Sequence, residues 1–537
     1  MISLVPDCHS NLTQIMQTGD ANKTNLISVM GISMGDEGKG RVVHEILEQI
    51  ELDSGKPAAG VMKVNGGANA GHTAAGLKLN LLPSGIGNPN VPKLLIGSGV
   101  VADPRKFIWE AKPLEARNLS VFSRLLIDEK TQVSDLSHRL LDLAWENYRV
   151  KQLGMDSRGS TGRGISPAYS DETSQWQIFY LAFKQDRKNF VSALKGRVQR
   201  ALDTIRYVCK VSEEDWTSFF ENLTESETRA NQESLGEGIF DQKEFDFTRF
   251  KAEKPFELNF DLLEEVYWQA GCELVSCIGD IRSVLLDSKK SGRPIVSEFG
   301  QAYWLDKRHG FTPNVTASHT TSAELFHSGG IPLQSVKEIG CCKAYDTKVG
   351  THHFLTKIDH ESDPLGKKLA KLEFGTSTGR QRMVGWFDAV EKGNALRYGG
   401  FDELVINKLD ALTLDEGLDC QLKICTAYRL ADGSLSTHVP RSEEVRQTLT
   451  PVYETLDGWE EDIGSISTYE KLPLNAKAYI SRMVGSLLEV AYPEGLSGLR
   501  LPLIRFVGVG PDPGQIISDI PPTDQLISEQ ILAHTPS

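Results

Sequence analysis

The chain has 537 residues, of which 40% are hydrophobic and 24% charged, so it is long enough to bury a sizeable core. Its net charge of −14 argues against a surface that coats nucleic acid, and no stretch reaches the roughly 18 apolar residues that span a bilayer. The 8 cysteines match no zinc-ligand spacing, so reduced thiols are expected. These features predict a cytoplasmic protein without nucleic-acid or membrane partners, in which local groups hold any anionic substrate.

The excess of negative charge is concentrated in one segment. Residues 212–265 hold 16 acidic and five basic side chains, a net charge of −11. Phe and Leu residues are interspersed throughout it, which is typical of a folded segment. We therefore expect an acidic insertion around residues 205–270. Residues 1–24 are expected to form an N-terminal extension and residues 513–537 a C-terminal tail.

A strand, a glycine-rich loop and a helix follow the extension. LISVMGIS (26–33) is an apolar run of strand length, MGDEGKG (34–40) comes next, and apolar residues from Val42 to Ile50 then recur at helical spacing. Backbone N–H groups and the positive end of a helix can hold a phosphate in this arrangement. The loop departs from the standard P-loop, because the chain has Ser33 and Gly40 where that motif needs Gly and then Ser or Thr. Phosphate binding and a plain tight turn both remain open readings of the loop alone.

More short apolar runs alternate with helix-length segments along the chain. This alternation predicts an α/β fold with a P-loop-like, mostly parallel central sheet, helices on both faces and inserted helical subdomains. Several of the runs end in Gly-rich loops, where open α/β sheets bind ligands. The runs are VMKV (61–64), LLIGSGVV (94–101), RLLID (124–128), ELVINKLD (403–410) and IRFVGVG (504–510).

Three further loops combine glycine with groups that bind phosphate or carboxylate. VNGGANAGHT (64–73) exposes backbone beside one titratable side chain, His72, which suits a phosphate site. A glycine-rich turn with a solvated histidine would have the same sequence pattern. DSRGSTGRGISPAYSD (156–171) offers hydroxyls together with Arg163 as phosphate donors. GTSTGRQR (375–382) offers hydroxyls and two guanidiniums, which suit carboxylate recognition. The alternative interpretation of this segment is a solvated basic turn.

NKLD (407–410) lies at the end of an apolar strand and fits the NKxD arrangement of GTP-binding proteins. In that arrangement the aspartate accepts hydrogen bonds from guanine N1–H and the 2-amino group, and the lysine stem covers the base. Adenine presents no matching pair of donors, so an acceptor such as Asp410 would select guanine.

These motifs together resemble the adenylosuccinate synthetase family. MGDEGKG, NAGHT, STGRGISPAY, EFGQAYWLDKRHG, TSTGRQR, GWFD, NKLD and GVGPD occur in the family's order and at nearly its spacing, from about Leu26 to Asp512. The resemblance implies one catalytic domain over residues 25–512, interrupted by the acidic insertion, and a homodimer. It also implies a GTP-dependent ligase that joins L-aspartate to C6 of a 6-oxopurine nucleotide, converting IMP, L-aspartate and GTP to adenylosuccinate, GDP and phosphate through a 6-phosphoryl intermediate.

The resemblance also implies a role for individual residues. Asp36 resembles the family's general base and magnesium ligand, His72 its general acid, and Gln301 a third catalytic residue. Mg²⁺ would be bound by Asp36 and the carbonyl of Gly71, with phosphates completing its oxygen shell. Acceptor contacts would come from Asp36, Glu37, Gly38, Lys39, Asn69, Ala70, Gly71, His72, Ser160, Thr161, Gln301, Thr316 and Arg380. Aspartate contacts would come from Thr376, Ser377, Thr378, Gly379, Arg380, Gln381 and Arg382. GTP contacts would come from Gly35, Asp36, Glu37, Gly38, Lys39, Gly40, Gly71, His72, Thr73, Arg382, Lys408, Leu409, Asp410, Gly508, Val509 and Gly510.

The chain departs from the family pattern at several places. It has Ala68 where members carry His or another polar residue, and Gln175 in place of an arginine that reaches across the dimer to the partner's nucleotide. VGTHHFLTK (349–357) replaces a segment richer in proline and glycine, and most of the extra length lies between Asp171 and Ser297. These departures indicate a paralogue, so the acceptor could also be GMP or dGMP. A phage branch of the family that aminates a guanine nucleotide lacks an Asp36-type base, and the presence of Asp36 therefore favours IMP.

Two other functions fit parts of the sequence. A catalytically silent homologue would bind nucleotide as a sensor and use the acidic insertion as a partner surface. A plain GTPase with a variant P-loop would explain NKLD but would leave TSTGRQR and STGRG without a role. The two predict, respectively, nucleotide binding without turnover and GTP turnover independent of purine and aspartate.

Overall fold

The computed structural model describes residues 25–348, 353–373, 381–418 and 421–533. The expected N-terminal extension, residues 349–352 of VGTHHFLTK, and residues 376–380 of the predicted aspartate loop lie outside the described residues. The helices are α2 Lys39–Ser54, α3 Pro104–Ala116, α4 Leu136–Lys151, α5 Ile165–Thr173, α6 Arg187–Asp203, α7 Glu213–Ala230, α8 Gln232–Gly236, α9 Phe260–Glu273, α10 Arg282–Ser291, α11 Ala323–Gly329, α12 Pro364–Leu372, α13 Ala389–Gly399, α14 Glu443–Gln447, α15 Leu474–Ala491 and α16 Thr523–Ala533.

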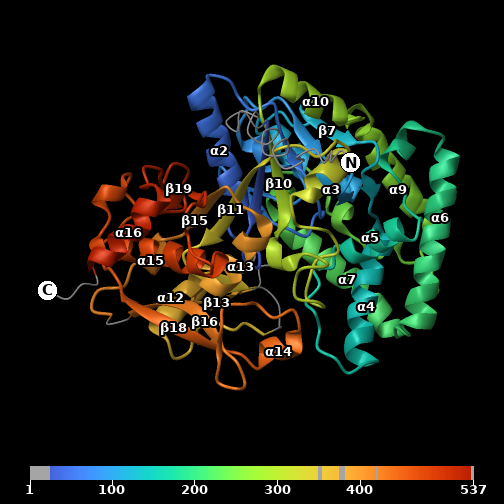
Figure 1. The fold of residues 1–537 in the computed structure, drawn as a ribbon. Coiled ribbons are helices and arrows are strands. Elements are labelled where there is room, and N and C mark those ends of the chain that lie inside the picture. Colours follow the sequence, from blue (N-terminus) through green and yellow to red (C-terminus); the bar gives the residue numbers. More distant parts are fainter. Residues whose placement is uncertain (1–24, 349–352, 374–380, 419–420, 534–537) are drawn as a thin grey trace, which may run out of the picture.

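The described residues form a ten-stranded sheet with the strand order β20-β19-β15-β11-β1-β10-β2-β5-β7-β9 (Figure 1). Its neighbouring strands pair in parallel except β19 and β20, which are antiparallel. The predicted fold class is therefore confirmed. The strands of this sheet are β1 Leu26–Gly31, β2 Gly60–Lys63, β5 Leu94–Ile96, β7 Leu125–Asp128, β9 Ile278–Gly279, β10 Ile295–Ala302, β11 Lys337–Lys343, β15 Glu403–Asn407, β19 Leu503–Gly508 and β20 Ile516–Ile517. The remaining strands are β3 His72–Ala74, β4 Leu77–Leu79, β6 Val101–Ala102, β8 Gln132–Val133, β12 Asp346–Lys348, β13 Met383–Gly385, β14 Phe387–Asp388, β16 Gln421–Arg429, β17 Leu435–Ser436 and β18 Thr450–Asp457.

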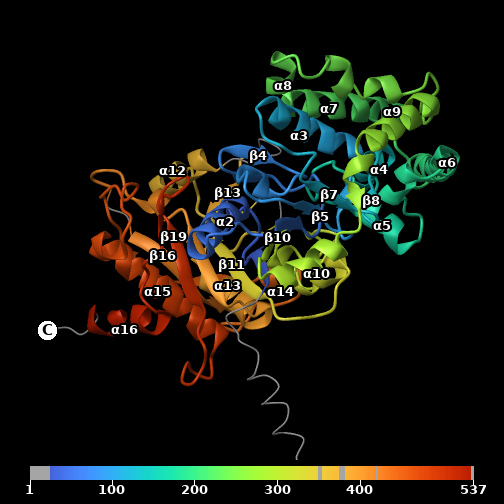
Figure 2. The same ribbon diagram turned by 90° about the horizontal axis from the view of Figure 1, so that it is seen from above.

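Strand β1 is buried on both faces, as a central parallel strand should be. Ile27 and Val29 pack with Val42 and Ile46 of α2 on one face. Met30 points to the other face and belongs to the core that includes α13 and α15. The period of two along the strand thus divides its side chains between two helical layers, which lie on opposite sides of the sheet in Figure 2.

The strands on either side of β1 are β10 and β11, and neither is among the runs that the sequence analysis singles out. Both are buried along almost their whole length, yet both carry charged or polar residues such as Glu298, Gln301 and Lys343. Mixed polarity hides a strand from a search for apolar runs. Each of these polar side chains proves to serve the site.

The acidic segment is folded and helical. Trp216 and Phe220 of α7, Phe245 before α9 and Tyr267 of α9 are buried in one core. That core also contains residues of α3, α4 and α6. Figure 2 shows α7, α8 and α9 stacked beside α3, away from the C-terminal helices α15 and α16. The acidic side chains on the outer face of α7 are solvated, because Glu213, Glu221 and Glu225 are exposed.

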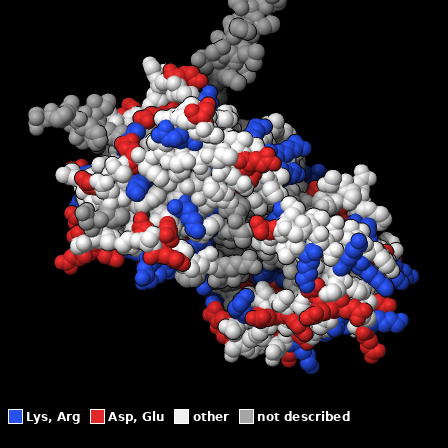
Figure 3. Space-filling model, turned by 90° about the horizontal axis from the view of Figure 1, so that it is seen from below, with Lys and Arg blue, Asp and Glu red and all other residues white. Residues whose placement is uncertain are grey.

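Residues 513–533, within the expected C-terminal tail, pack onto the main body. Strand β20 pairs with β19, and Ile517 and Leu526 are fully buried. On the face drawn in Figure 3, Lys and Arg side chains are interspersed with Asp and Glu. Within the described residues, no helix is both long and apolar enough to cross a membrane.

The inner face of α2 should contribute measurably to stability. Ile46 is fully buried against the sheet, whereas Leu52 of the same helix is 79% exposed. We expect Ile46→Ala to lower the free energy of unfolding by about 2–5 kcal/mol, because it removes buried methyl groups and leaves a cavity. Leu52→Ala should change it by less than about 0.5 kcal/mol. Urea denaturation measures both, and equal effects would contradict the assignment of the buried face.

Candidate active site

A cleft of about 700 Å³ lies where β1, β2, β10, β11 and β15 end. Carboxyl ends of parallel strands meet at one edge of a sheet, and that edge is where open α/β folds bind ligands. The predicted residues that line the cleft are Gly35, Asp36, Gly38, Lys39, Gly40, Asn69, Ala70, Gly71, His72, Thr73, Ser160, Thr161, Gln301, Thr316, Arg382, Lys408, Asp410 and Gly510. Residues brought together from across the chain thus share one cavity.

The loop after β1 is shaped to hold an anion. Gly35, Asp36 and Gly38 all have positive φ, at 105°, 62° and 81°, which turns the backbone sharply before α2 begins. The N–H of Gly35 donates to Oε1 of Glu37 at 2.7 Å, and Nζ of Lys39 donates to Oε2 at 2.9 Å. Burial alone would raise the pKa of Glu37, but Lys39 and the Gly35 N–H lower it. Glu37 therefore lies beneath the loop, whereas the sequence analysis expects it to contact ligand.

Asp36 projects from this loop and pairs with Arg382. The distance from Arg382 Nε to Asp36 Oδ2 is 2.7 Å, and Nη1 of the same guanidinium lies 2.7 Å from Oε2 of Glu373. Asp36 is 29% exposed, so its carboxylate is accessible from the cleft. Arg382 comes from the end of the predicted aspartate loop, so this ion pair joins that loop to the glycine-rich loop.

Glu373 collects several donors in the interior. Its Oε1 accepts from Lys343 Nζ at 2.9 Å, from Tyr345 Oη at 2.5 Å and from Lys408 Nζ at 2.7 Å, and Glu373 itself is fully buried. Burial would raise the pKa of Glu373, yet Lys343 and Lys408 hold it well below its ordinary value. Burial lowers the pKa of Lys343 to about 8 despite this partner. The lysine of NKLD is thus fixed by a carboxylate that the motif does not contain.

His72 forms a dyad with Glu298 of β10. Nδ1 of His72 is hydrogen-bonded to Oε1 of Glu298, while Oε2 accepts from the backbone N–H of Ser84 at 2.8 Å. Burial alone would raise the pKa of Glu298, but His72, Lys63 and the Ser84 N–H lower it to about 2. The ionised carboxylate orients the imidazole in the cleft.

Several buried polar atoms on cleft residues have no hydrogen-bond partner among the described residues. They include Nε2 of His72, Nε2 of Gln301, Oγ1 of Thr316, Oδ1 of Asn407 and Oδ1 of Asp410. Such atoms are rare in protein interiors and mark places where a ligand or water binds. Burial raises the pKa of Asp410, and its backbone neighbour Leu409 donates to the Gly508 carbonyl at 3.0 Å, which ties NKLD to the GVGPD loop.

A divalent ion would find few protein ligands here. Asp36 and Gly71 line the same cleft, but the described residues contain no group of three or more His, Cys, Asp or Glu side chains that could hold a metal. One accessible carboxylate in a phosphate site suits Mg²⁺, which takes most of its oxygens from phosphates and water. The residues present therefore fit this ion.

Some predicted residues lie away from the cavity wall. Leu409, Gly508 and Val509 do not line it, and Gln381 donates to the Ala370 carbonyl at 3.3 Å. The other predicted aspartate-loop residues, Thr376, Ser377, Thr378, Gly379 and Arg380, lie outside the described residues.

Arg163, expected to donate to phosphate, pairs with buried Glu227 instead of lining the cleft. That expectation is wrong, because a carboxylate remote in sequence captures the guanidinium.

Sequence reasoning missed Glu298, Glu373, Lys343, Asn407 and Asp142. Glu298 lies three residues before Gln301, and Glu373 lies three before Thr376, so both were within reach of recognised motifs. Asn407 donates to the Glu37 carbonyl at 2.7 Å, and Asp142 accepts from Ser160 Oγ at 2.7 Å. Asp142 gave no local signal, because a lone acid on an amphipathic helix looks like a solvated residue.

The fold and the cleft together define a nucleotide-binding α/β enzyme, and comparison with known proteins gives its family. The sequence profile of adenylosuccinate synthetase matches residues 28–236 and 226–492. The adenylosuccinate synthetase of Aliivibrio fischeri is 33% identical over 508 residues, 93% of this chain and 99% of its own. That of Nitratidesulfovibrio vulgaris is 32% identical over 499 residues, 91% of this chain and 99% of its own. The fully ligated adenylosuccinate synthetase of Plasmodium falciparum superposes with a TM-score of 0.72 at 25% identity, covering 92% of this chain and all of that one (100%). The chain belongs to the adenylosuccinate synthetase family and is a ligase of that type.

The low pKa of Glu298 predicts how stability depends on pH. Its folded value of about 2 lies below the ordinary glutamate value of about 4.3, so its stabilising contribution is present above pH 4.3 and is lost as the pH falls towards 2. A shift of this size corresponds to about 3 kcal/mol. We expect Glu298→Gln to be less stable than the parent at pH 7, with the difference shrinking between pH 5 and pH 2. Urea denaturation across this range measures it, with Glu470→Gln, whose side chain is 92% exposed, as control. A difference that does not change with pH would contradict the assignment.

Proposed function

We propose that this protein joins L-aspartate to C6 of IMP, using GTP and Mg²⁺, through a 6-phosphoryl intermediate. The observation that carries the proposal is the shared cleft: Asp36 and His72 line the same cavity as Asp410. An acid–base pair beside a guanine-selecting carboxylate is what transfer of the γ-phosphoryl group from GTP to a purine requires.

Asp36 is the proposed general base. It takes the proton from purine N1, and the electron pair moves to O6, which attacks the γ-phosphorus and displaces GDP. Oδ2 of Asp36 already pairs with Arg382, which leaves Oδ1 for the proton. The aspartate amine then attacks C6, and phosphate leaves with the oxygen. Phosphorylation thus converts a poor leaving group into a good one.

His72 is the proposed acid. With Nδ1 held by Glu298, its free Nε2 can donate a hydrogen bond to oxygen that gains charge during phosphoryl transfer. Mg²⁺, held by Asp36 and the Gly71 carbonyl, would neutralise phosphate charge. Gln301 and Thr316, whose polar atoms lack partners, would contact the acceptor nucleotide.

Asp410 and Lys408 form the proposed guanine end. The unpartnered Oδ1 of Asp410 is an acceptor for guanine N1–H or its amino group. Lys408 is held by Glu373, which orients its stem along the cleft wall. ATP presents no matching donor pair, so GTP is the proposed phosphoryl donor.

The acceptor assignment rests on Asp36, because a base at this position needs a purine with an N1 proton. IMP has that proton, and so do GMP and dGMP, which remain the alternative acceptors. A silent nucleotide-binding homologue is the other alternative, and the complete set of Asp36, His72 and Asp410 disfavours it.

We also propose a homodimer, supported by exposed apolar side chains on neighbouring elements. Trp145 of α4 is 38% exposed, Leu153 and Met155 just beyond that helix are 53% and 46% exposed, and Trp176 after α5 is 52% exposed. Apolar side chains exposed on a surface favour association. The expected cytoplasmic location stays a prediction.

Phosphate release from GTP and Mg²⁺ tests the proposed reaction directly. Release should require both L-aspartate and one purine nucleotide, when IMP, dIMP, GMP, dGMP and XMP are compared in separate assays. We expect the highest kcat/KM with IMP. Release without purine or aspartate would indicate a plain GTPase, and nucleotide binding without release would indicate the silent homologue.

Asp36→Asn tests the base. We expect kcat to fall by at least about 10³-fold, because the amide cannot take the N1 proton, while the Kd for GTP changes by less than about fivefold. Asp53→Asn, an exposed position on α2, is the matched control and should keep full activity. Full activity of Asp36→Asn would refute the assignment.

A further inference from the structure

The loop of residues 157–164, here called the acceptor loop, is held from behind by α4. Ser160 Oγ donates to Asp142 Oδ1 at 2.7 Å, and the Gly164 N–H donates to Asp142 Oδ2 at 3.1 Å. Nε of Arg139 donates to the Gly162 carbonyl at 3.0 Å. Ser160 and Thr161 of this loop line the cleft, so whatever fixes α4 and Arg139 also fixes that wall.

Glu227 reaches this loop from the acidic segment. It lies on α7, is fully buried, and pairs with Arg139 at 3.0 Å and also with Arg163 of the acceptor loop. One carboxylate therefore neutralises two buried guanidiniums, one of which belongs to the loop itself. Removing a partner from such a cluster leaves uncompensated charge in the interior, so the geometry is tightly specified.

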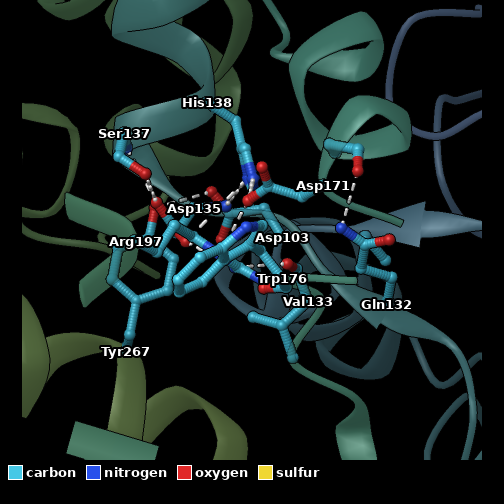
Figure 4. Close-up of polar contacts among 12 residues, drawn as sticks. Asp103, Gln132, Val133, Asp135, Ser137, His138, Asp171, Trp176, Arg197 and Tyr267 are labelled. Atoms are coloured by element: carbon cyan, nitrogen blue, oxygen red, sulfur yellow. Dashed lines mark hydrogen bonds and ion pairs between the residues drawn. The ribbon is translucent and has the colours of Figure 1, made fainter. Parts of the chain in front are cut away.

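Contacts made by α6, which precedes the acidic segment, and by α4 itself join the two helices that flank the acceptor loop. Figure 4 shows Arg197 of α6 and His138 of α4 converging on Asp135 and Asp171. Nη1 of Arg197 lies 2.8 Å from Asp135 Oδ2, and Nε2 of His138 lies 3.1 Å from Asp171 Oδ2. Asp171 belongs to α5, which begins directly after the loop. The helices on either side of the acceptor loop are thus tied to each other, and Glu227 pairs with Arg163 within the loop.

Glu227 differs from the other acidic residues of its helix. Glu213, Glu214, Glu221 and Glu225 are exposed, and Asp215 is half-buried beside Lys151. Solvated acids on an outer face contribute little to stability or positioning. Among the acidic residues of α7, only Glu227 is buried, and it joins the acidic segment to the acceptor loop.

We propose that Glu227 is a positioning residue for the acceptor nucleotide, and that the acidic insertion serves to place this carboxylate against Arg139 and Arg163. The inference rests on the proposed function, in which the acceptor loop contacts the purine nucleotide. Glu227 touches no substrate. It acts by holding Arg163 out of the cleft and by keeping the Arg139 side chain on the Gly162 carbonyl. Loss of the carboxylate therefore affects acceptor binding more than GTP binding, because the GTP end is built from β1, β15 and the loop after β19.

The test compares Glu227→Gln with Glu225→Gln, an exposed glutamate on the same helix. For Glu227→Gln we expect the KM for the acceptor to rise about tenfold, equivalent to about 1.4 kcal/mol, with the KM for GTP changed less than twofold. Glu225→Gln should match the parent. An unchanged acceptor KM, or a loss of kcat with both KM values unchanged, would overturn the proposal, since a purely structural role lowers only the active fraction.

A second variant covers the case in which Glu227→Gln does not fold. The double variant Glu227→Gln/Arg163→Gln removes one carboxylate and one guanidinium together, so less charge is left uncompensated. It should fold, and its acceptor KM should still exceed that of the parent, because Arg139 has lost its partner. A parental acceptor KM in the double variant would overturn the proposal.

Binding measurements separate this inference from the proposed reaction. Titration calorimetry with IMP and with GTP, on parent and variants, needs no turnover. A parent that binds IMP but shows no aspartate-dependent phosphate release would refute the reaction and still test Glu227, for which we expect about tenfold weaker IMP binding. Equal IMP affinity in parent and Glu227→Gln would refute the positioning role whatever the activity.

Discussion

The ion pairs around the buried carboxylate of Glu373 hold the cleft together. Glu373 directly follows α12 and accepts from Lys343 at the end of β11 and from Lys408 after β15. Arg382 links it to Asp36 on the glycine-rich loop. Four segments that are distant in sequence therefore meet at one charge. Because the charge is buried and multiply bonded, a shift of any one segment would leave a cation or the carboxylate unpaired in the interior, which is costly.

Ion pairs between a buried carboxylate and a cationic side chain recur around the cavity. Glu37 holds Lys39 beneath the glycine-rich loop, Glu298 holds His72, and Glu227 holds two arginines behind the acceptor loop. A chain with a net charge of −14 still has to bind nucleotides that are themselves polyanions. The cations that line the cleft include Lys39, Arg382 and Lys408, and each of these pairs with a carboxylate of the protein. Pre-positioned charge of this kind costs little reorganisation when the substrate binds.

The sequence predicted the strands whose side chains are uniformly apolar, and it missed β10 and β11, whose inward residues include Glu298 and Lys343. The motif residues Asp36, His72 and Asp410 were found because each lies in a short loop with a recognisable pattern. Their partners were not, because Glu298 lies 226 residues from His72 and Glu373 lies 35 residues from Lys408. Arg163 was misassigned for the same reason: a guanidinium in a hydroxyl-rich loop looks like a phosphate donor until its carboxylate, 64 positions further along the sequence, is brought beside it. Local pattern identifies chemical groups, and tertiary contacts decide which way they point.

The positions of the residues that depart from the family pattern indicate which part of the proposed function each could affect. Ala68 is buried beside the loop before His72, and Gln175 is an exposed residue after α5; neither lines the cleft. The family resemblance gives an arginine at the position of Gln175 a role on a second subunit, so its absence bears on the proposed homodimer and leaves the proposed chemistry at Asp36 untouched. The acidic insertion contacts the acceptor loop through Glu227, which pairs with Arg163. The proposed positioning role of Glu227 places support for the acceptor wall within one chain, because both guanidiniums that it pairs with belong to the same chain.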